Sequence, residues 1–222
     1  MATTSGFSPK ATRFFQDLEE NNSREWWTAH ADVWEREVKQ PMTELLESLP
    51  ERYQPFRLFR MNRDLRFTKD KSPYKTHLGA MSEAGGKDYY LHLDGKGLMV
   101  AAGWYMLEPD QLERYRSAVA DDRSGLALVS ILTELESRSV QTQGLGMPTL
   151  KTAPRGYAKD HPRAELLRRK GLIGYRTLTG TKLRDRGAVR DFVVETFEAC
   201  GPLVAWLSEH VGASAGRSAA RG

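Results

Sequence analysis

The stretch YYLHLDGKGLMVAAGWYM, residues 89–106, carries the clearest structural pattern in the chain. Its first six residues alternate, so that Leu91 and Leu93 lie on one face of a strand and His92 lies on the other. The Asp-Gly-Lys-Gly that follows is typical of a hairpin turn, and the strand pattern then resumes as far as Met106. We therefore predict an antiparallel β-hairpin here.

Weaker strand signals and several helical patterns flank this hairpin. The segments with strand character are residues 56–61 and 171–178. Apolar residues at helical spacing predict helices over 9–20, 22–49, 126–137 and 188–211, another that begins at Glu108, and a short one from Asp160 to Lys170. The sequence shows no regular βαβ alternation and no Gly-x-Gly-x-x-Gly or Walker loop. It therefore predicts an α+β fold, with helices packed on a mainly antiparallel sheet that contains a central hairpin.

Local signals refine the helices and loops. Asn22, with Glu25 three residues later, resembles a capping box that opens the second helix. Pro41 is expected to kink or split that helix, because proline disrupts the backbone hydrogen bonds of a helix interior. The Gly-Pro pair at 201–202 is expected to interrupt the last helix. Residues 138–158 contain several glycines and prolines and predict a long loop, a kind that is usually functional or mobile.

The composition is that of an ordinary globular protein. Of the 222 residues, 40% are hydrophobic and 28% are charged, which predicts one domain over residues 7–211 with disordered tails at 1–6 and 212–222. The single cysteine, Cys200, excludes an intrachain disulfide and is expected in the core. The N-terminus lacks the apolar core of a signal peptide, and the longest apolar run is shorter than a membrane helix. We therefore expect a cytoplasmic protein with no membrane partner.

Positive charge is concentrated in two segments. Residues 57–77 contain seven basic and two acidic side chains, and residues 151–170 contain the same numbers, so each segment carries a net +5. Because the whole chain carries +4, the remainder carries −6. A mildly acidic protein with two basic segments favours a localised anion site over diffuse binding. We expect the two segments to meet in one basic cleft.

The basic segments supply side chains suited to an anionic small molecule. Arginine offers a planar fork for two parallel hydrogen bonds to phosphate or carboxylate, and lysine adds a compact charge. The candidate ligand-binding residues are Arg60, Arg63, Asp64, Arg66, Lys69, Lys71, Tyr74, Lys75, Tyr90, Arg155 and Lys159. The candidate general acids or bases beside a bound phosphate are His77, His92 and His161. No cofactor is implied.

Other functions explain the same charges. A solvated loop with local salt bridges needs no ligand. A nucleic-acid-binding module would place basic residues on phosphates and tyrosines on bases, although no known nucleic-acid motif is present. A protein-interaction scaffold would dock an acidic partner on the basic loop. A metal site built from His92 and Asp94 with His77 or His161 is a weaker alternative, because no tight ligand motif is present. The oligomeric state stays open.

Four motifs resemble a known family. They lie at residues 21–26 (NNSREW), 63–77 (RDLRFTKDKSPYKTH), 89–92 (YYLH) and 153–162 (APRGYAKDHP). The chain is similar over most of residues 7–207 to conserved hypothetical proteins, mainly bacterial with fungal members, that are classed as a domain of unknown function. The resemblance implies a single full-length domain and brings no established activity or catalytic residue. Asn62, where the family usually has an aromatic or aliphatic residue, is a small departure.

Overall fold

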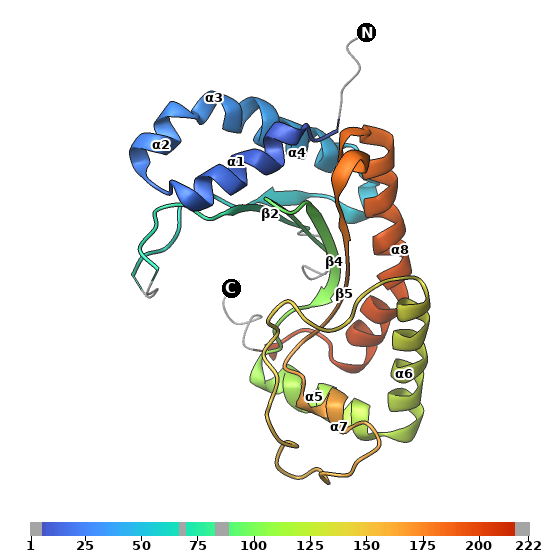
Figure 1. Ribbon diagram of the computed structural model, residues 1–222. Helices are drawn as coiled ribbons and strands as arrows, with labels where there is room; N and C mark the ends of the chain where they lie inside the picture. The colour runs from blue at the N-terminus through green and yellow to red at the C-terminus, as the bar shows by residue number, and fades with distance from the viewer. Residues whose placement is uncertain (1–5, 67–69, 83–88, 216–222) are drawn as a thin grey trace. The chain divides into compact units, whose positions relative to one another are not determined.

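The computed structural model describes residues 6–66, 70–82 and 89–215 (Figure 1). Its contacts divide the chain into two compact units, which are described separately below. The prediction of one domain over residues 7–211 stays a prediction. Unit 1 consists of Met1–Val100 and Thr177–Glu195, and unit 2 consists of Ala101–Arg176 and Thr196–Gly222.

The fold is α+β, as the sequence predicts. Within the described residues, five strands form one antiparallel sheet in the order β1-β2-β3-β4-β5. The predicted hairpin is β3–β4, and its turn is closed by the Asp94 N–H, which donates to the Gly97 carbonyl at 3.1 Å. The strands are β1 (Phe56–Leu58), β2 (His77–Ser82), β3 (Tyr89–Asp94), β4 (Leu98–Trp104) and β5 (Leu172–Leu178).

Most helices of unit 1 come before its strands in the sequence, and the others follow β5. The first, predicted over residues 9–20, is confirmed as α1, whose buried side chains include Phe14, Phe15 and Leu18. Ser8 caps α1 by accepting a hydrogen bond from the Lys10 N–H. The other helices of unit 1 are α2 (Arg24–Ala29), α3 (Ala31–Val33), the π-helix η1 (Trp34–Lys39), α4 (Gln40–Glu47), the 3₁₀ turns η2 (Glu51–Tyr53) and η3 (Gly180–Arg184), and the first part of α8 (Arg186–His210).

The segment predicted as one helix over residues 22–49 is divided into several pieces. Its cap is Ser23, which accepts from the Trp26 N–H, and Asn22 is not the cap that the sequence suggested. The π-helix η1 ends at Lys39, and α4 follows at once from Gln40, with Pro41 as its second residue. Lys39 and Gln40 both keep right-handed helical backbone angles, so the helix changes from π to α beside Pro41 and is not split there. A proline cannot donate the backbone hydrogen bond of a helix interior, which places this change of hydrogen-bonding pattern next to it.

The antiparallel register of β2 and β3 separates an apolar face from a polar face in unit 1. Leu78 pairs with Leu93, and Ala80 pairs with Leu91, and all four of these side chains are buried. Helix α1 packs against β3 (Figure 1). Strand β2 was not predicted, because its sequence HLGAMS carries a central glycine and no sustained alternation.

Unit 2 is built from helices around the ends of β4 and β5. Helix α5 (Pro109–Ala120) begins with a capping box of Glu108 and Gln111. The predicted start of this helix at Glu108 is therefore confirmed. Helix α6 (Asp122–Ser137) starts four residues before the predicted position. Cys200, in the second part of α8, is buried as expected. Burial raises the pKa of its thiol to about 12.

The long loop predicted over residues 138–158 is confirmed, because after α6 the described chain has no helix or strand until residue 164. Two isolated antiparallel bridges, between Gln141 and Tyr175 and between Thr149 and Arg169, connect this loop to the rest of unit 2. Two other predictions in unit 2 need correction. The short helix α7 covers only Ala164–Arg168, and no side chain caps it, so Asp160 does not. Helix α8 runs without a break past Pro202, because its buried residues Leu203, Trp206 and Leu207 hold the following turns against unit 2.

The ends of the described chain are hydrogen-bonded. The Gly6 N–H donates to the Arg184 carbonyl, and the Ala213 carbonyl accepts from Arg114. Ser214 Oγ donates to Asp110 at 2.8 Å. Residues 212–215 therefore do not form the start of a disordered tail, and the rest of the predicted tails, 1–5 and 216–222, lies outside the described residues. Among the described helices, none combines the length and apolar character that crossing a bilayer requires.

Candidate functional site

The polar face of β2 and β3 in unit 1 carries a row of hydrogen-bonding side chains. Tyr90, His92 and Asp94 follow one another on β3, and the ring of His77 on β2 stacks on His92 at 4.3 Å between centroids. We call these four residues the polar row. All four are partly exposed, so they are open to a ligand while their neighbours restrict their orientation.

His92 is held by a partner on each side. Its Nε2 lies 3.3 Å from Asp94 Oδ2, and its Nδ1 lies 3.4 Å from the Tyr90 hydroxyl. A carboxylate only accepts hydrogen bonds, so Nε2 of the neutral ring carries the proton, and Nδ1 accepts from Tyr90. Hydrogen bonding thus sets the tautomer of His92 and aims its lone pair at a hydroxyl, the arrangement that proton transfer requires.

Glycine at position 79 makes room for this arrangement. Gly79 pairs with His92 across the two strands. A Cβ atom added at Gly79 would lie 2.7 Å from the Tyr90 hydroxyl and 3.0 Å from the Phe59 ring. Any larger residue would therefore push Tyr90 away from His92.

Burial shapes the charges of the polar row. It lowers the pKa of His77 to about 4, and the nearby charges of His92 and Lys75 act in the same direction. Burial also raises the pKa of Tyr90 to about 12. For Asp94, burial raises the pKa, but hydrogen bonds from His92 and from the backbone of Lys96 and Gly97 outweigh it and bring the pKa below its ordinary value. At neutral pH the row therefore holds a neutral His77, a neutral Tyr90 and an ionised Asp94.

Three basic residues form what we call the cation group: Arg60, Arg63 and Lys75. The charges of Lys75 and Arg63 act on His77 of the polar row, and the charge of Arg60 acts on Lys75. The Lys75 Nζ donates to the Arg60 carbonyl at 2.9 Å, and the Lys75 N–H donates to the Met61 carbonyl at 2.8 Å. Burial lowers the pKa of Lys75, and the positive charges of Arg60 and Arg63 lower it further. In the part of the chain that the structure describes, neither Arg60 nor Lys75 forms an ion pair.

Arg63 is partly committed within unit 1. Its Nη1 forms an ion pair with Asp70, and its Nη2 donates to the Tyr74 carbonyl at 3.2 Å. Its Nε is buried and has no hydrogen-bond partner among the described residues. A buried donor without an acceptor is costly, so Arg63 is not fully satisfied by the protein around it.

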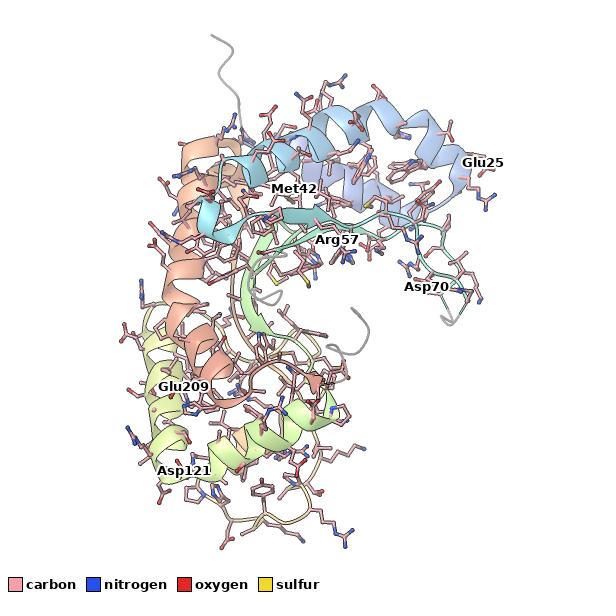
Figure 2. All side chains as sticks on the ribbon, turned by 180° about the vertical axis from the view of Figure 1, so that it is seen from behind. Glu25, Met42, Arg57, Asp70, Asp121 and Glu209 are labelled. Carbon is pink, nitrogen blue, oxygen red and sulfur yellow. The ribbon has the colours of Figure 1, made fainter. Side chains whose placement is uncertain are left out.

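The tip of the first basic segment neutralises much of its own charge. Arg66 donates to both carboxylate oxygens of Asp64, at 3.0 and 2.8 Å. These hydrogen bonds lower the pKa of Asp64. Lys71 donates to the Leu65 carbonyl at 2.9 Å. Figure 2 shows Arg57 on β1 and Asp70 on the loop that follows it. The predicted residue Lys69 lies outside the described residues.

Tyr74 anchors this loop to the helices. Its ring stacks on Trp27 at 4.2 Å and is only 9% exposed. Asn22 completes the anchor, because its side chain donates to the Tyr74 carbonyl at 2.9 Å and accepts from the Tyr74 N–H at 3.1 Å. The sequence suggested Tyr74 as a ligand contact and Asn22 as a helix cap; in the structure both hold the loop in position.

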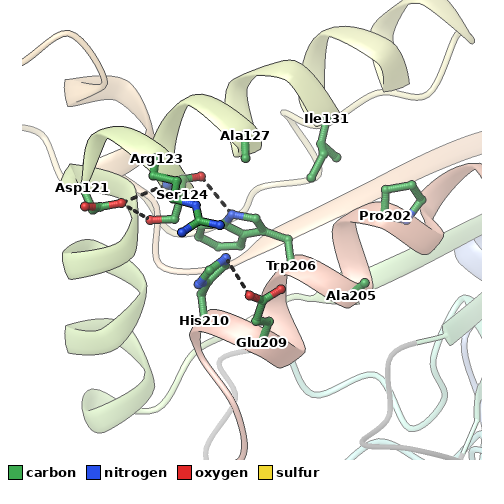
Figure 3. Close-up of a pocket in the computed structure, with 10 residues that line it drawn as sticks. All are labelled: Asp121, Arg123, Ser124, Ala127, Ile131, Pro202, Ala205, Trp206, Glu209 and His210. Carbon is green, nitrogen blue, oxygen red and sulfur yellow. Dashed lines mark hydrogen bonds and ion pairs between the residues drawn. The ribbon is translucent and has the colours of Figure 1, made fainter.

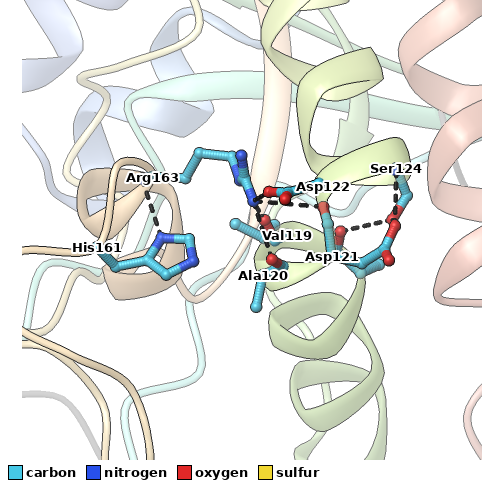
Figure 4. A network of polar contacts seen from close by, with 8 residues as sticks. Val119, Ala120, Asp121, Asp122, Ser124, His161 and Arg163 are labelled. Carbon is cyan, nitrogen blue, oxygen red and sulfur yellow. Dashed lines mark hydrogen bonds and ion pairs between the residues drawn. The ribbon is translucent and has the colours of Figure 1, made fainter.

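The second basic segment belongs to unit 2, whereas the first belongs to unit 1. Arg155 and Lys159 are exposed on its loop. His161 has a local role, since its Nδ1 accepts from the Arg163 N–H at 3.0 Å (Figure 4). The expectation that the two basic segments meet in one cleft stays a prediction.

Arg163 was counted only as part of the positive charge, but it is a buried residue of unit 2, 7% exposed. Its guanidinium donates to the carbonyls of Val119 and Ala120 at 2.6 and 2.9 Å, and to Asp122 Oδ1 at 2.8 Å (Figure 4). Val119 and Ala120 end helix α5, where carbonyls lack partners within the helix. Arg163 therefore caps α5 from a distant part of the sequence.

Unit 2 also contains a pocket of about 580 Å³ between α6 and the end of α8 (Figure 3). Trp206 forms part of its wall and donates from Nε1 to the Ser124 carbonyl at 3.0 Å. The charged residues of the lining include two acids and one arginine: Asp121, Glu209 and Arg123. This balance of charge does not favour an anion, so the cation group of unit 1 is the stronger candidate for one.

Metal ligation was a weaker alternative for the histidines. Among the described residues, no group of three or more His, Cys, Asp or Glu side chains is arranged to hold a metal ion. His92 and Asp94 are neighbours, as the alternation of β3 suggested, but the third side chain beside them is the stacked ring of His77. Gly79 was not predicted as part of this site, because its role depends on a cross-strand pairing with His92 that cannot be read from β2 alone.

His77 makes the stability of the protein depend on pH. Its pKa of about 4 in the folded protein is below the ordinary value of 6.5, so the unfolded chain binds the proton more tightly. Stability is therefore expected to fall as the pH falls from about 6.5 to about 4, by roughly 1–3 kcal/mol after allowance for partial exposure. Urea unfolding of the wild type and of His77→Gln at pH 7.5 and 4.5 measures this. The account is contradicted if the variant loses as much stability between the two pH values as the wild type.

Comparison with known proteins gives a family and no activity. No curated protein and no protein of solved structure shows significant similarity to the chain. The profile of a family described as "Conserved hypothetical protein (DUF2461)" matches residues 10–206. This match covers both the polar row and the cation group, and the resemblance seen in the motifs is confirmed. The chain belongs to the DUF2461 family of conserved hypothetical proteins.

Proposed function

We propose that the protein binds a phosphate- or carboxylate-bearing small molecule at the cation group of unit 1, beside the polar row. The observation that supports this most is the pair of Arg60 and Lys75, whose charges are close enough to lower the pKa of Lys75 and which form no ion pair within the described residues. Two unit charges 4 Å apart repel by roughly 1 kcal/mol in water and about 4 kcal/mol near a protein surface. A bound anion replaces this repulsion by attraction to each cation.

The polar row gives the proposed site the means for acid–base chemistry. The Tyr90 hydroxyl donates to His92 Nδ1, and Asp94 stabilises the charge that His92 gains when it takes a proton. In this proposal His92 is the general base. The Tyr90 hydroxyl, which donates to His92, is the group nearest to the proton that passes between the ligand and His92. The neutral His77 supports the ring of His92 by stacking. Arg63, already held by Asp70, positions the loop and contributes its charge.

Calorimetric titration with inorganic phosphate, followed by sugar phosphates and dicarboxylates, tests the proposal. Arg60→Gln is expected to weaken phosphate binding by about tenfold or more, which corresponds to about 1.4 kcal/mol. The matched control is Arg13→Gln on α1, because Arg13 is an exposed arginine of the same unit that pairs with Asp17. Absence of heat with every anion, or equal weakening in both variants, contradicts the proposal.

The same titrations separate the alternative functions. A nucleic-acid-binding module would bind oligonucleotides much more tightly than phosphate, with an affinity that falls steeply with salt. A scaffold for an acidic partner would bind acidic peptides and no small anion. The proposal includes a cytoplasmic location, which the lone buried Cys200 supports because disulfides accumulate in proteins of oxidising compartments.

A further inference from the structure

We propose that unit 2 contains a second binding site, in which Arg169 holds the carboxylate of a small organic acid such as acetate or formate. Arg169 is 8% exposed, and its Nη1 donates to the Thr142 carbonyl, on the long loop, at 3.0 Å. Both residues belong to unit 2. The inference therefore does not rest on the function proposed for the cation group of unit 1.

The backbone fixes where the guanidinium of Arg169 lies. Arg169 directly follows α7, and its N–H donates to the Leu166 carbonyl at 3.0 Å. Thr142 is fixed separately, because the backbone of its neighbour Gln141 exchanges two hydrogen bonds with Tyr175, at 2.9 and 2.8 Å. The contact between Arg169 and Thr142 therefore joins two segments that are each held by the protein.

The protein uses little of the hydrogen-bonding capacity of the Arg169 guanidinium. A guanidinium has five N–H donors, and among the described residues only the Thr142 carbonyl accepts from this side chain. The edge formed by Nε and Nη2, which offers two parallel hydrogen bonds, has no acceptor there. These two nitrogens remain in reach of solvent, because the fully enclosed side-chain nitrogen and oxygen atoms without a partner, in the described part of the chain, are Arg63 Nε and Thr142 Oγ1. A small molecule can therefore approach the unused edge.

Arg163 shows how the same unit satisfies a buried arginine that has a structural role. It is 7% exposed, nearly the same as Arg169, but its guanidinium donates to four oxygen atoms, one of which belongs to the Asp122 carboxylate. Arg169 has one acceptor and forms no ion pair among the described residues. Burying a charge without a partner is costly. A carboxylate bound at the unused edge removes that cost.

The surroundings of Arg169 favour an anion that is planar and carries a single charge. A carboxylate matches the two parallel hydrogen bonds of the edge formed by Nε and Nη2. Burial lowers the pKa of Arg169, while Tyr115, Glu136 and Glu165 act in the opposite direction. The two glutamates are thus close enough to repel a bound anion, and a doubly charged phosphate would be repelled more than a carboxylate. One negative charge neutralises the guanidinium without leaving an excess.

Nuclear magnetic resonance of the arginine Nε–H groups in the wild-type protein tests this inference, with acetate added at constant ionic strength. We expect the Arg169 signal to shift in a saturable manner, together with the backbone amide signals of residues 141–143. The Arg163 signal should stay in place, because its Nε already donates to the Val119 carbonyl at 2.6 Å. Inorganic phosphate is expected to bind Arg169 at least about tenfold more weakly than acetate.

Two lysine variants show whether the planar edge of Arg169 holds the acetate. Arg169→Lys keeps the charge but lacks that edge, so acetate is expected to bind at least about tenfold more weakly. Arg168→Lys is the matched control and should keep the wild-type affinity, because Arg168 already donates to the Leu150 carbonyl at 2.8 Å and to Glu165 at 2.7 Å. Equal weakening in both variants overturns the inference. So does a wild-type Arg169 signal that stays in place or drifts without saturation, a result that decides the matter even if Arg169→Lys does not fold.

Discussion

Substitution of Arg163 by methionine is expected to lower the free energy of unfolding by about 3–5 kcal/mol. Methionine keeps much of the apolar stem but removes the guanidinium that satisfies the carbonyls of Val119 and Ala120. These carbonyls would be left buried without partners at the end of α5. Urea unfolding followed by circular dichroism measures the loss, which is a large share of the stability of an ordinary domain.

Two controls distinguish the carbonyl contacts of Arg163 from its ion pair. Asp122→Ala removes only the ion pair, and the Asp122 side chain is 89% exposed, so a loss of less than about 1 kcal/mol is expected. Arg123→Met removes an exposed arginine from the same region and is expected to change stability by about 0.5 kcal/mol or less. If Arg163→Met costs no more than these controls, Arg163 does not cap α5 in the way described.

The double charge reversal Arg60→Glu and Lys75→Glu is expected to abolish binding of inorganic phosphate, with a loss of about 100-fold or more. Each substitution removes an attraction and adds a repulsion for the anion. Because both residues are at least partly exposed, we expect the protein to remain folded. Calorimetric titration gives the affinity, and thermal unfolding of the same samples checks that the fold is retained.

The matched control reverses two charges elsewhere in unit 1. Arg13→Glu and Lys39→Glu changes the net charge of +4 by the same amount as the cation-group variant. Arg13 and Lys39 are ion-paired residues of α1 and η1. The control is expected to keep most of the phosphate affinity at physiological salt, because charges beyond about 8–10 Å are screened. Equal loss in both double variants would mean that net charge, and not a local site, attracts the anion.

The parts of the fold that the sequence predicts correctly are those with strong local patterns. Helix α1 and the hairpin β3–β4 follow from periodicity and turn composition, and both are present. The errors occur where a distant contact overrides a local preference. Asn22 had the right composition for a cap, yet its side chain binds the backbone of Tyr74, 52 residues away. Packing of Trp206 and its neighbours carries α8 past Pro202.

The candidate site shows the same contrast between local sequence patterns, which could be predicted, and contacts between distant residues, which could not. The segment that contains Arg60, Arg63 and Lys75 was identified from its density of basic residues, which is a local property of the sequence. The ion-pair partner of each charged residue was not predictable, because it depends on which residues are neighbours in space. Asp64 pairs with Arg66, whereas Asp70 pairs with Arg63. The importance of Gly79, opposite His92, and of Arg163, at the end of α5, appears only in three dimensions.

A nuclear magnetic resonance titration with inorganic phosphate tests the central claim most directly, because it shows where an anion binds without a variant. We predict that backbone amide signals of residues 60–63, 75–79 and 90–94 shift together, in a saturable manner, while those of α1 and η1 stay in place. Signals that move only outside these residues, or that drift in proportion to ionic strength without saturation, would contradict an anion site at the cation group.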